Sequence, residues 1–294
     1  MRYLTTGIIF TILLTVMGHG AEAQKTDHFQ LDETYPLESE GIVKLQSSDA
    51  DVKILGSSRD DVHLVVNYTM EITGFALEEG DRFGMNIRQD DGQLIIEEKE
   101  RELPNATASI GFTKVEYTIT LEVPEKIHLD IAGDDDTYRI SNVDRSISLD
   151  ADDAGVELRN CEGEDFFFEM DDGDLQMDRA AGRLKLVMDD GAADIARGSL
   201  RDLNVDMEDG SVSLATELFD DGRYRLSMDD GRLDLSIVGG GGIFRIDHDN
   251  TRFNVAEPFT LTEEGDTHKT YRLAGGNAEV QIRIDDGRIQ LNTL

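Results

Sequence analysis

Apolar and polar residues alternate through short repeated units over most of the chain. Four successive units share one template, which consists of alternating apolar positions, an acidic pair, Gly, and a second alternating run. The four units are FFFEMDDGDLQM (166–177), LKLVMDDGAADI (184–195), LNVDMEDGSVSL (203–214) and YRLSMDDGRLDL (224–235). Such alternation predicts strands with one buried face. In the second unit the predicted inward residues are Leu184, Leu186, Met188, Ala193 and Ile195.

The acidic pair recurs at a nearly constant interval. Its first member falls, in steps of 18 to 21 residues, at Asp134, Asp152, Asp171, Asp189, Glu208, Asp229 and Asp249. A period this regular is typical of a structural repeat. Two earlier units, at 43–54 and 84–95, are farther apart and less regular. We therefore predict irregular N-terminal β repeats and a cap over 24–125, and regular repeats over 126–294.

Two all-β arrangements fit this pattern, because helical spacing of apolar residues is absent after the N-terminal segment. If each acidic turn is a corner, the units stack in parallel about 4.8 Å apart as a single-stranded β-solenoid, or β-helix. If each acidic turn closes a hairpin, the chain is an antiparallel β-meander. The similar lengths of the units favour the solenoid. Stacking would then form one internal column of Met170, Met188, Met207 and Met228, with His248 in the next place.

The first residues have the features of a secretory signal peptide. Arg2 precedes an apolar stretch from Ile8 to Met17, and small residues stand at Ala21 and Ala23. We expect residues 1–23 to be a signal peptide, cleaved after Ala23, which leaves an extracytoplasmic protein in the periplasm, at the cell surface or secreted. No other stretch is apolar enough for direct membrane insertion.

The formal net charge of -34 limits the choice of partners. A surface this negative repels phosphates, so nucleic acid is excluded, and cations, basic proteins or neutral glycans are the expected contacts. A salt-loving host would produce a similar surface. Cys161 is the only cysteine, so the chain cannot form an internal disulfide. We interpret Cys161 as a small buried side chain rather than a reactive thiol.

The repeated acids form the one pattern with chemical significance. In a solenoid the acidic pairs would line one edge and could attract Ca²⁺, which prefers six to eight oxygen ligands. The candidate cation ladder comprises Asp171, Asp172, Asp189, Asp190, Glu208, Asp209, Asp229 and Asp230. The simpler interpretation, which we favour, is that Asp-Asp-Gly is turn chemistry on a solvated edge.

Catalytic chemistry is not indicated by the remaining residues. Paired carboxylates serve in glycoside hydrolysis, so a polysaccharide lyase or hydrolase on a β-helix is the alternative. A catalytic pair is unique, however, whereas these pairs recur in unit after unit. The histidines lack metal-ligand spacing, and His248 is expected in the core. We predict a protein that is not an enzyme and has no catalytic residues and no required cofactor.

Two segments carry a family resemblance. YTITLEVPEKIHLDIAGDDDTYRIS (117–141), followed by the tandem units, resembles the bacterial putative-adhesin β-repeat family, and VKLQSSDADVKILGSSRDDVHLVV (43–66) is similar to the opening repeat of that family. The resemblance implies a β-solenoid in an extracytoplasmic protein and transfers no catalytic residues. Asp-Asp-Gly replaces the small Ser/Gly turns of that family, so a shared ligand is not implied.

These observations lead to a functional hypothesis. We expect an exported, non-enzymatic β-repeat protein that acts in adhesion, in binding or as a cell-envelope scaffold. Its partner would be a protein or glycan of the cell surface or envelope. A component of envelope-stress sensing is a further alternative, because the resembling family includes such proteins.

Overall fold

The computed structural model describes residues 23–74, 82–99 and 112–294, and every regular element in them is a β-strand. This confirms the all-β prediction. The predicted signal peptide lies outside the described residues except for Ala23, the first residue of β1. The strands are β1 (Ala23–Pro36), β2 (Ile42–Gln46), β3 (Asp51–Ser57), β4 (Asp61–Gly74), β5 (Met85–Asp90), β6 (Gln93–Glu98), β7 (Phe112–Pro124), β8 (His128–Gly133), β9 (Asp136–Ser141), β10 (Ile147–Arg159), β11 (Glu162–Asp178), β12 (Ala181–Glu217), β13 (Arg223–Gly239), β14 (Gly242–Val255), β15 (Thr260–Glu264), β16 (His268–Leu273) and β17 (Ala278–Thr293).

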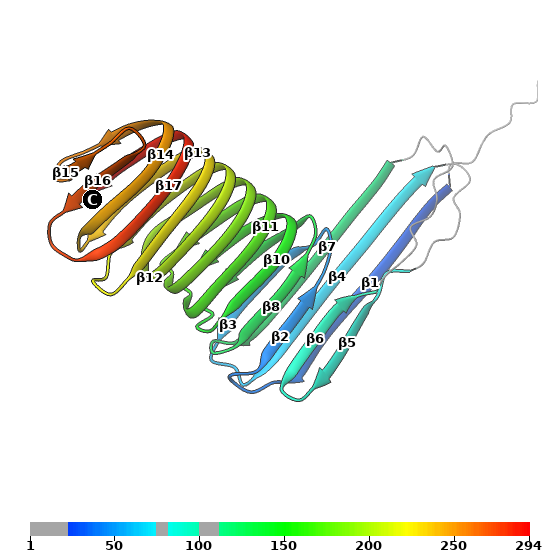
Figure 1. Cartoon of the computed structure of the whole chain (residues 1–294). Helices are drawn as coiled ribbons and strands as arrows, with labels where there is room; N and C mark the ends of the chain where they lie inside the picture. The colour runs from blue at the N-terminus through cyan, green and yellow to red at the C-terminus, as the bar shows by residue number, and fades with distance from the viewer. Residues whose placement is uncertain (1–22, 75–81, 100–111) are drawn as a thin grey trace, which may run out of the picture.

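The repeat units stack in parallel as coils (Figure 1). From β8–β9 onward, each coil consists of two strand segments that meet at an acidic corner. β10 pairs in parallel with β11, β11 with the first half of β12, and the second half of β12 with β13. Repeat units therefore lie side by side in register, which confirms the solenoid and excludes a meander for this region.

The inward residues form a continuous core. Met170 lies opposite Met188, and Met207 lies opposite Met228, and all four are at most 2% exposed. The predicted inward set of the second unit is buried throughout. Every second side chain of a coil points inward, where it packs against the inward side chain at the same position of the neighbouring coil. Burial of apolar area is the main source of stability in such a stack.

The C-terminal coils do not follow the order of the chain. β17 lies between β13 and β14, parallel to both, so the red strand separates the yellow and orange ones in Figure 1. Met228 therefore faces Ile284, and His248 faces the other side of Ile284. The prediction that His248 directly follows Met228 in the column was wrong, because chain order does not reveal an inserted strand.

A similar insertion occurs near the N-terminal end. β2 lies between β6 and β8, and β3 lies between β7 and β9, all in parallel. The segments 24–125 and 126–294 therefore share one continuous sheet. Counted from β6 and β7 to β14, ten coils stack within the described residues, a length of roughly 40 Å at the usual strand spacing.

Antiparallel strands cover both ends of the stack. At the N-terminal end β1, β4 and β7 pair in that order and extend beyond the coils, and β5 pairs with β6 (Figure 1). At the C-terminal end β15 and β16 continue from β14. These strands occupy backbone groups that a stack of parallel coils would leave unpaired. No helix in the described residues is long and apolar enough to cross a membrane.

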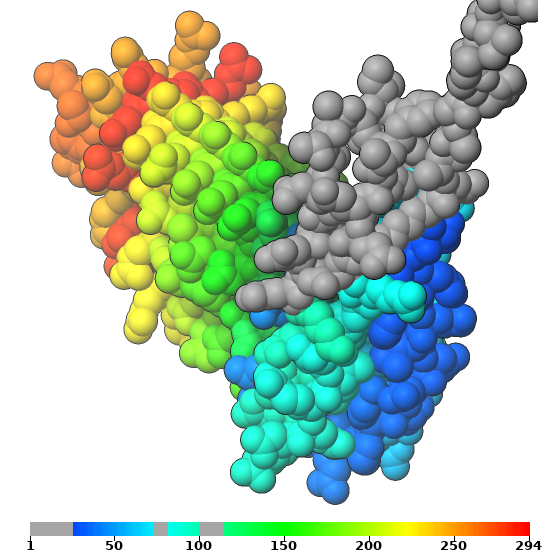
Figure 2. Space-filling view, turned by 90° about the vertical axis from the view of Figure 1, so that its right-hand side faces the viewer, coloured from blue at the N-terminus to red at the C-terminus, as the bar shows by residue number. Residues whose placement is uncertain are grey.

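Ion pairs link neighbouring coils on the outer surface. Arg183 contacts Asp165 at 2.6 Å, and Arg145 contacts Glu164 at 2.6 Å, each across one coil. Exposed pairs of this kind contribute little to the free energy of unfolding. Their effect is to hold long side chains in a fixed pattern, so the outer faces present ordered charges. Figure 2 shows the successive coils as coloured bands on the surface.

Candidate functional site

The acidic corners of the coils align into one ridge. Asp172 lies between Asp153 and Asp190 in register, and Asp230 lies between Asp209 and Asp286. Each of these acids is preceded by another, so the ridge has two parallel columns. We call acidic ridge the set Asp134, Asp135, Asp152, Asp153, Asp171, Asp172, Asp189, Asp190, Glu208, Asp209, Asp229, Asp230, Asp285, Asp286 and Asp249. All eight residues of the predicted ladder belong to it.

A glycine after the acidic pair, at Gly173, Gly191, Gly210, Gly231 and Gly287, allows the coils to stack closely. Gly191 has a φ of 137°, a region that side-chain-bearing residues rarely adopt. A Cβ at Gly191 would lie 2.0 Å from the carbonyl oxygen of Gly173 in the preceding coil. Gly210 and Gly231 repeat this arrangement. The corner is therefore a tight backbone contact, and it brings the neighbouring carboxylates close together.

Three carboxylates of the ridge have a raised pKa. For Asp153 and Asp230, loss of surrounding water raises the pKa first, and the charges of adjacent ridge carboxylates raise it further. Asp134, at the N-terminal end of the ridge, has a pKa raised by the same causes. Folding therefore concentrates negative charge where the unfolded chain would disperse it.

The ridge is an exposed row rather than a coordination shell. In the parts of the chain that the structure describes, no group of three or more His, Cys, Asp or Glu side chains is arranged to hold a metal ion. The eight predicted ladder residues are all exposed. The carboxylates of the ridge can attract cations along the whole row, because their electrostatic potentials add.

The pKa shifts predict an unusual pH dependence. A carboxyl group whose pKa is raised on folding holds its proton more tightly in the folded state, so the stability it contributes at acidic pH is lost as pH rises. Asp153, Asp230 and Asp134 are of this kind. The melting temperature should therefore rise as pH falls from 7 towards the ordinary Asp pKa of 3.8.

Below that pH the trend should reverse. Glu40 and Asp178 have pKa values lowered chiefly by hydrogen bonds from arginine, so their stabilisation is lost as pH falls through those values. Thermal unfolding followed by circular dichroism from pH 3 to pH 8 at constant ionic strength would test both limbs. A melting temperature that falls steadily from pH 7 downwards would contradict the assignment.

One buried carboxylate, that of Asp136, was not identified as a candidate from the sequence. It lies at the N-terminal end of the row of stacked corner glycines. Asp136 is 2% exposed and occupies the position that Gly fills in later coils. It accepts hydrogen bonds from the Tyr138 hydroxyl at 2.6 Å, from the Ser47 hydroxyl at 3.0 Å and from the Ala50 backbone N–H at 2.6 Å. Burial raises its pKa, whereas these hydrogen bonds lower it. The network joins the β2–β3 coil to the β8–β9 coil, and the run of three acids in the sequence was its only signal.

The other candidate residues do not gather into a site. Cys161 is buried, which confirms the sequence interpretation, and burial raises the pKa of its thiol. Phe167 has the Lys185 ammonium 4.7 Å from its ring centroid. His248 is only partly buried, so the expectation that it lies in the core was wrong, and its Nδ1 lies 3.2 Å from the Asp249 carbonyl oxygen. The described histidines remain on separate elements.

Comparison with known proteins gives a family match over most of the chain. Residues 41–292 match the Toastrack DUF4097 family. No curated protein matches the sequence.

Three solved structures of bacterial proteins are among those that match the chain. A putative cell adhesion protein from Clostridium sporogenes is 12% identical, with 93% of this chain and 100% of that chain covered and a TM-score of 0.22. A putative adhesin from Bacteroides fragilis is 8% identical, with 90% and 97% covered and a TM-score of 0.33. A putative adhesin from Parabacteroides merdae is 10% identical, with 89% and 95% covered and a TM-score of 0.36.

Proposed function

The chain belongs to the Toastrack DUF4097 family, and from its repeated, ordered surface we propose that it is an exported, non-enzymatic binding protein of the cell envelope. It acts outside the cytoplasm in adhesion or as a scaffold. Its partner is a protein or glycan of the cell surface or envelope.

The observation that carries this proposal is the equivalence of the coils. Ten coils stack over roughly 40 Å in the described residues, and the eight from β8–β9 to β14 carry acids in the same place from coil to coil. Stacked repeats are suited to binding along an extended face. A catalytic pair would instead need one corner with its own geometry, whereas Asp172, Asp190 and Asp209 occupy matching corners.

Binding to envelopes tests the proposal. The purified chain lacking residues 1–23 should sediment with isolated bacterial envelopes, and pretreatment of the envelopes with protease or with glycosidase should identify the partner class. No sedimentation with envelopes would overturn the proposed binding role. Incubation with polyuronates provides the second arm, because release of unsaturated sugars would replace the binding proposal with a lyase.

We further propose that the acidic ridge associates with cations, Ca²⁺ among them, as a diffuse layer. The raised pKa values of Asp153 and Asp230 support this, because after loss of surrounding water the charges of adjacent ridge carboxylates raise them further. A divalent cation between neighbouring coils would relieve that repulsion more effectively than sodium ions at the same ionic strength.

Cation association predicts a calcium-specific stabilisation. The melting temperature should be higher in millimolar Ca²⁺ than in NaCl of equal ionic strength. The variant Asp190→Asn/Asp209→Asn should lose part of this difference. Glu169→Gln/Asp206→Asn, which removes two exposed acids away from the corners, should keep it. If the unmodified protein has the same melting temperature in the two salts, the acidic pairs serve only to form turns and the cation proposal is wrong.

A further inference from the structure

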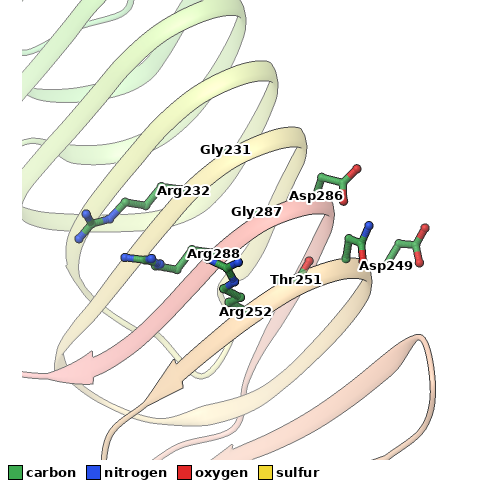
Figure 3. A pocket seen from close by; sticks show the side chains of 9 residues that line it. Gly231, Arg232, Asp249, Thr251, Arg252, Asp286, Gly287 and Arg288 are labelled. Carbon is green, nitrogen blue, oxygen red and sulfur yellow. The ribbon is translucent and has the colours of Figure 1, made fainter.

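A row of arginines crosses the C-terminal coils beside the acidic ridge. Arg288 of β17 lies between Arg232 of β13 and Arg252 of β14 in register. We call these three residues the arginine row. Neighbouring members belong to strands about 4.8 Å apart. In Figure 3 the arginine side chains extend to one side of the corner, whereas Asp286 and Asp249 point to the other.

The repeat does not require arginine at this position. In the preceding coils the same outward column holds Asp174, Ala192 and Ser211. Those coils have the same corner glycine and the same buried alternation, so the position is free to vary. Three consecutive arginines therefore mark a local departure from the template, confined to the coils around the inserted strand.

Two of the arginines lack a carboxylate partner. Arg232 pairs with Asp234 at 2.6 Å. Arg252 and Arg288 form no ion pair or side-chain hydrogen bond with any other described residue, although the chain carries a net charge of -34. Next to them along the strands are the amides of Asn254 and Gln290, which contact one another at 3.4 Å. The charges of Arg252 and Arg288 are therefore not neutralised by an ion pair, unlike that of Arg232.

The same residues line an open hollow on the surface. Arg232, Arg252 and Arg288 form one part of its lining, and the corner residues, among them Asp249 and Asp286 of the acidic ridge, form another. Its volume is about 800 Å³, enough for a sugar-sized ligand. Adjacent guanidinium groups and a hollow beside them are what an oxyanion needs, because each guanidinium offers a planar pair of donors.

We propose that the arginine row binds a compact, doubly charged oxyanion, a phosphate or sulfate group carried by an otherwise uncharged ligand such as a sugar. The two unpaired guanidinium charges match the charge of such a group better than that of a single carboxylate. The acidic ridge begins two residues away, at Asp286, and repels any ligand whose negative charge continues past the row. The neighbourhood therefore selects one isolated anionic group over a long polyanion.

Titration with small anions tests this site. The protein at low ionic strength would be titrated with inorganic phosphate, sulfate, glucose 6-phosphate and glucose, with binding followed by calorimetry. We expect phosphate and glucose 6-phosphate to bind with a Kd on the order of 1 mM. Glucose should not bind. Sulfate binding equal to phosphate binding would assign the site to tetrahedral dianions in general, as proposed.

Matched variants distinguish phosphate binding by the arginine row from a general effect of the protein's charge on binding. Arg252→Gln/Arg288→Gln should weaken phosphate binding at least tenfold. Arg245→Gln/Arg283→Gln removes the same charge from the same two strands, but from arginines that face Glu279 and Asp285, and should leave binding unchanged. Arg252→Lys/Arg288→Lys keeps the charge without the planar donors, so its affinity should be intermediate.

Three results would overturn the proposal. They are absence of phosphate binding in the unmodified protein, retention of binding in Arg252→Gln/Arg288→Gln, and equal loss in the two glutamine pairs. Circular dichroism of each variant without phosphate would confirm the fold, which these exposed positions should not disturb. Envelope binding that persists in Arg252→Gln/Arg288→Gln would leave the proposed function intact, so the two proposals fail separately.

Discussion

Replacement of Gly191 by Ala is expected to destabilise the protein by at least about 3 kcal/mol. Two costs add. The backbone at this corner has a φ of 137°, which Ala adopts only with strain. The new Cβ would also lie 2.0 Å from the carbonyl oxygen of Gly173, so the two coils would have to separate. Urea unfolding followed by circular dichroism would measure the change.

Gly155→Ala is the matched control for that result. Gly155 belongs to the corner of β10, but its φ lies outside the region that favours glycine. A Cβ there would meet only the Thr137 side chain, at 3.9 Å. We expect a change smaller than about 1 kcal/mol. Similar destabilisation by Gly155→Ala and Gly191→Ala would contradict the view that close coil contact sets the glycine requirement.

Asp136→Ala is expected to destabilise the protein by about 2 to 4 kcal/mol, although the position holds Gly or Ala in later coils. The substitution leaves the Tyr138 hydroxyl and the Ala50 N–H without their acceptor in a buried place. The free energy lost by leaving these groups unpaired exceeds the free energy gained by removing the desolvated carboxylate. Chemical unfolding at pH 7 would measure the effect.

A double-mutant cycle would identify the cause. The register neighbours of Tyr138 are Val52 and Val156, so an apolar side chain suits this column. Tyr138→Phe removes the hydroxyl that Asp136→Ala would leave unpaired. The double variant should therefore be more stable than the sum of the single changes predicts, by about 1 kcal/mol. Strict additivity would show that the Tyr138 hydroxyl does not depend on Asp136.

The regular part of the fold follows from local pattern. Alternation in units such as 184–195 indicates which side chains face inward, and the constant interval indicates that the units stack. Asp-Asp-Gly alone does not distinguish a hairpin from a corner, since Gly suits both. The close contact between Gly191 and Gly173 shows why the corner carries Gly, and it is a contact between coils that no single unit reveals.

The chain ends were not predictable in the same way. The unit 280–291 repeats the acidic template, yet its sequence gives no sign that it lies before β14 instead of after it. Placement of His248 next to Met228 failed for this reason. The arginine row depends on the same insertion. Arg232 and Arg252 lie on strands that do not pair with each other, and Arg288 on the inserted strand β17 lies between them.

The insertion of β17 also constrains when the protein completes its fold. During synthesis β14 emerges from the ribosome before β17, yet β14 joins the preceding coils through its parallel pairing with β17, which in turn pairs with β13. The edge of β13 must therefore stay open until the last residues are released. Assembly cannot proceed as a simple zipper from one end to the other, and a nascent chain would need protection from pairing with other chains until its final strand arrives.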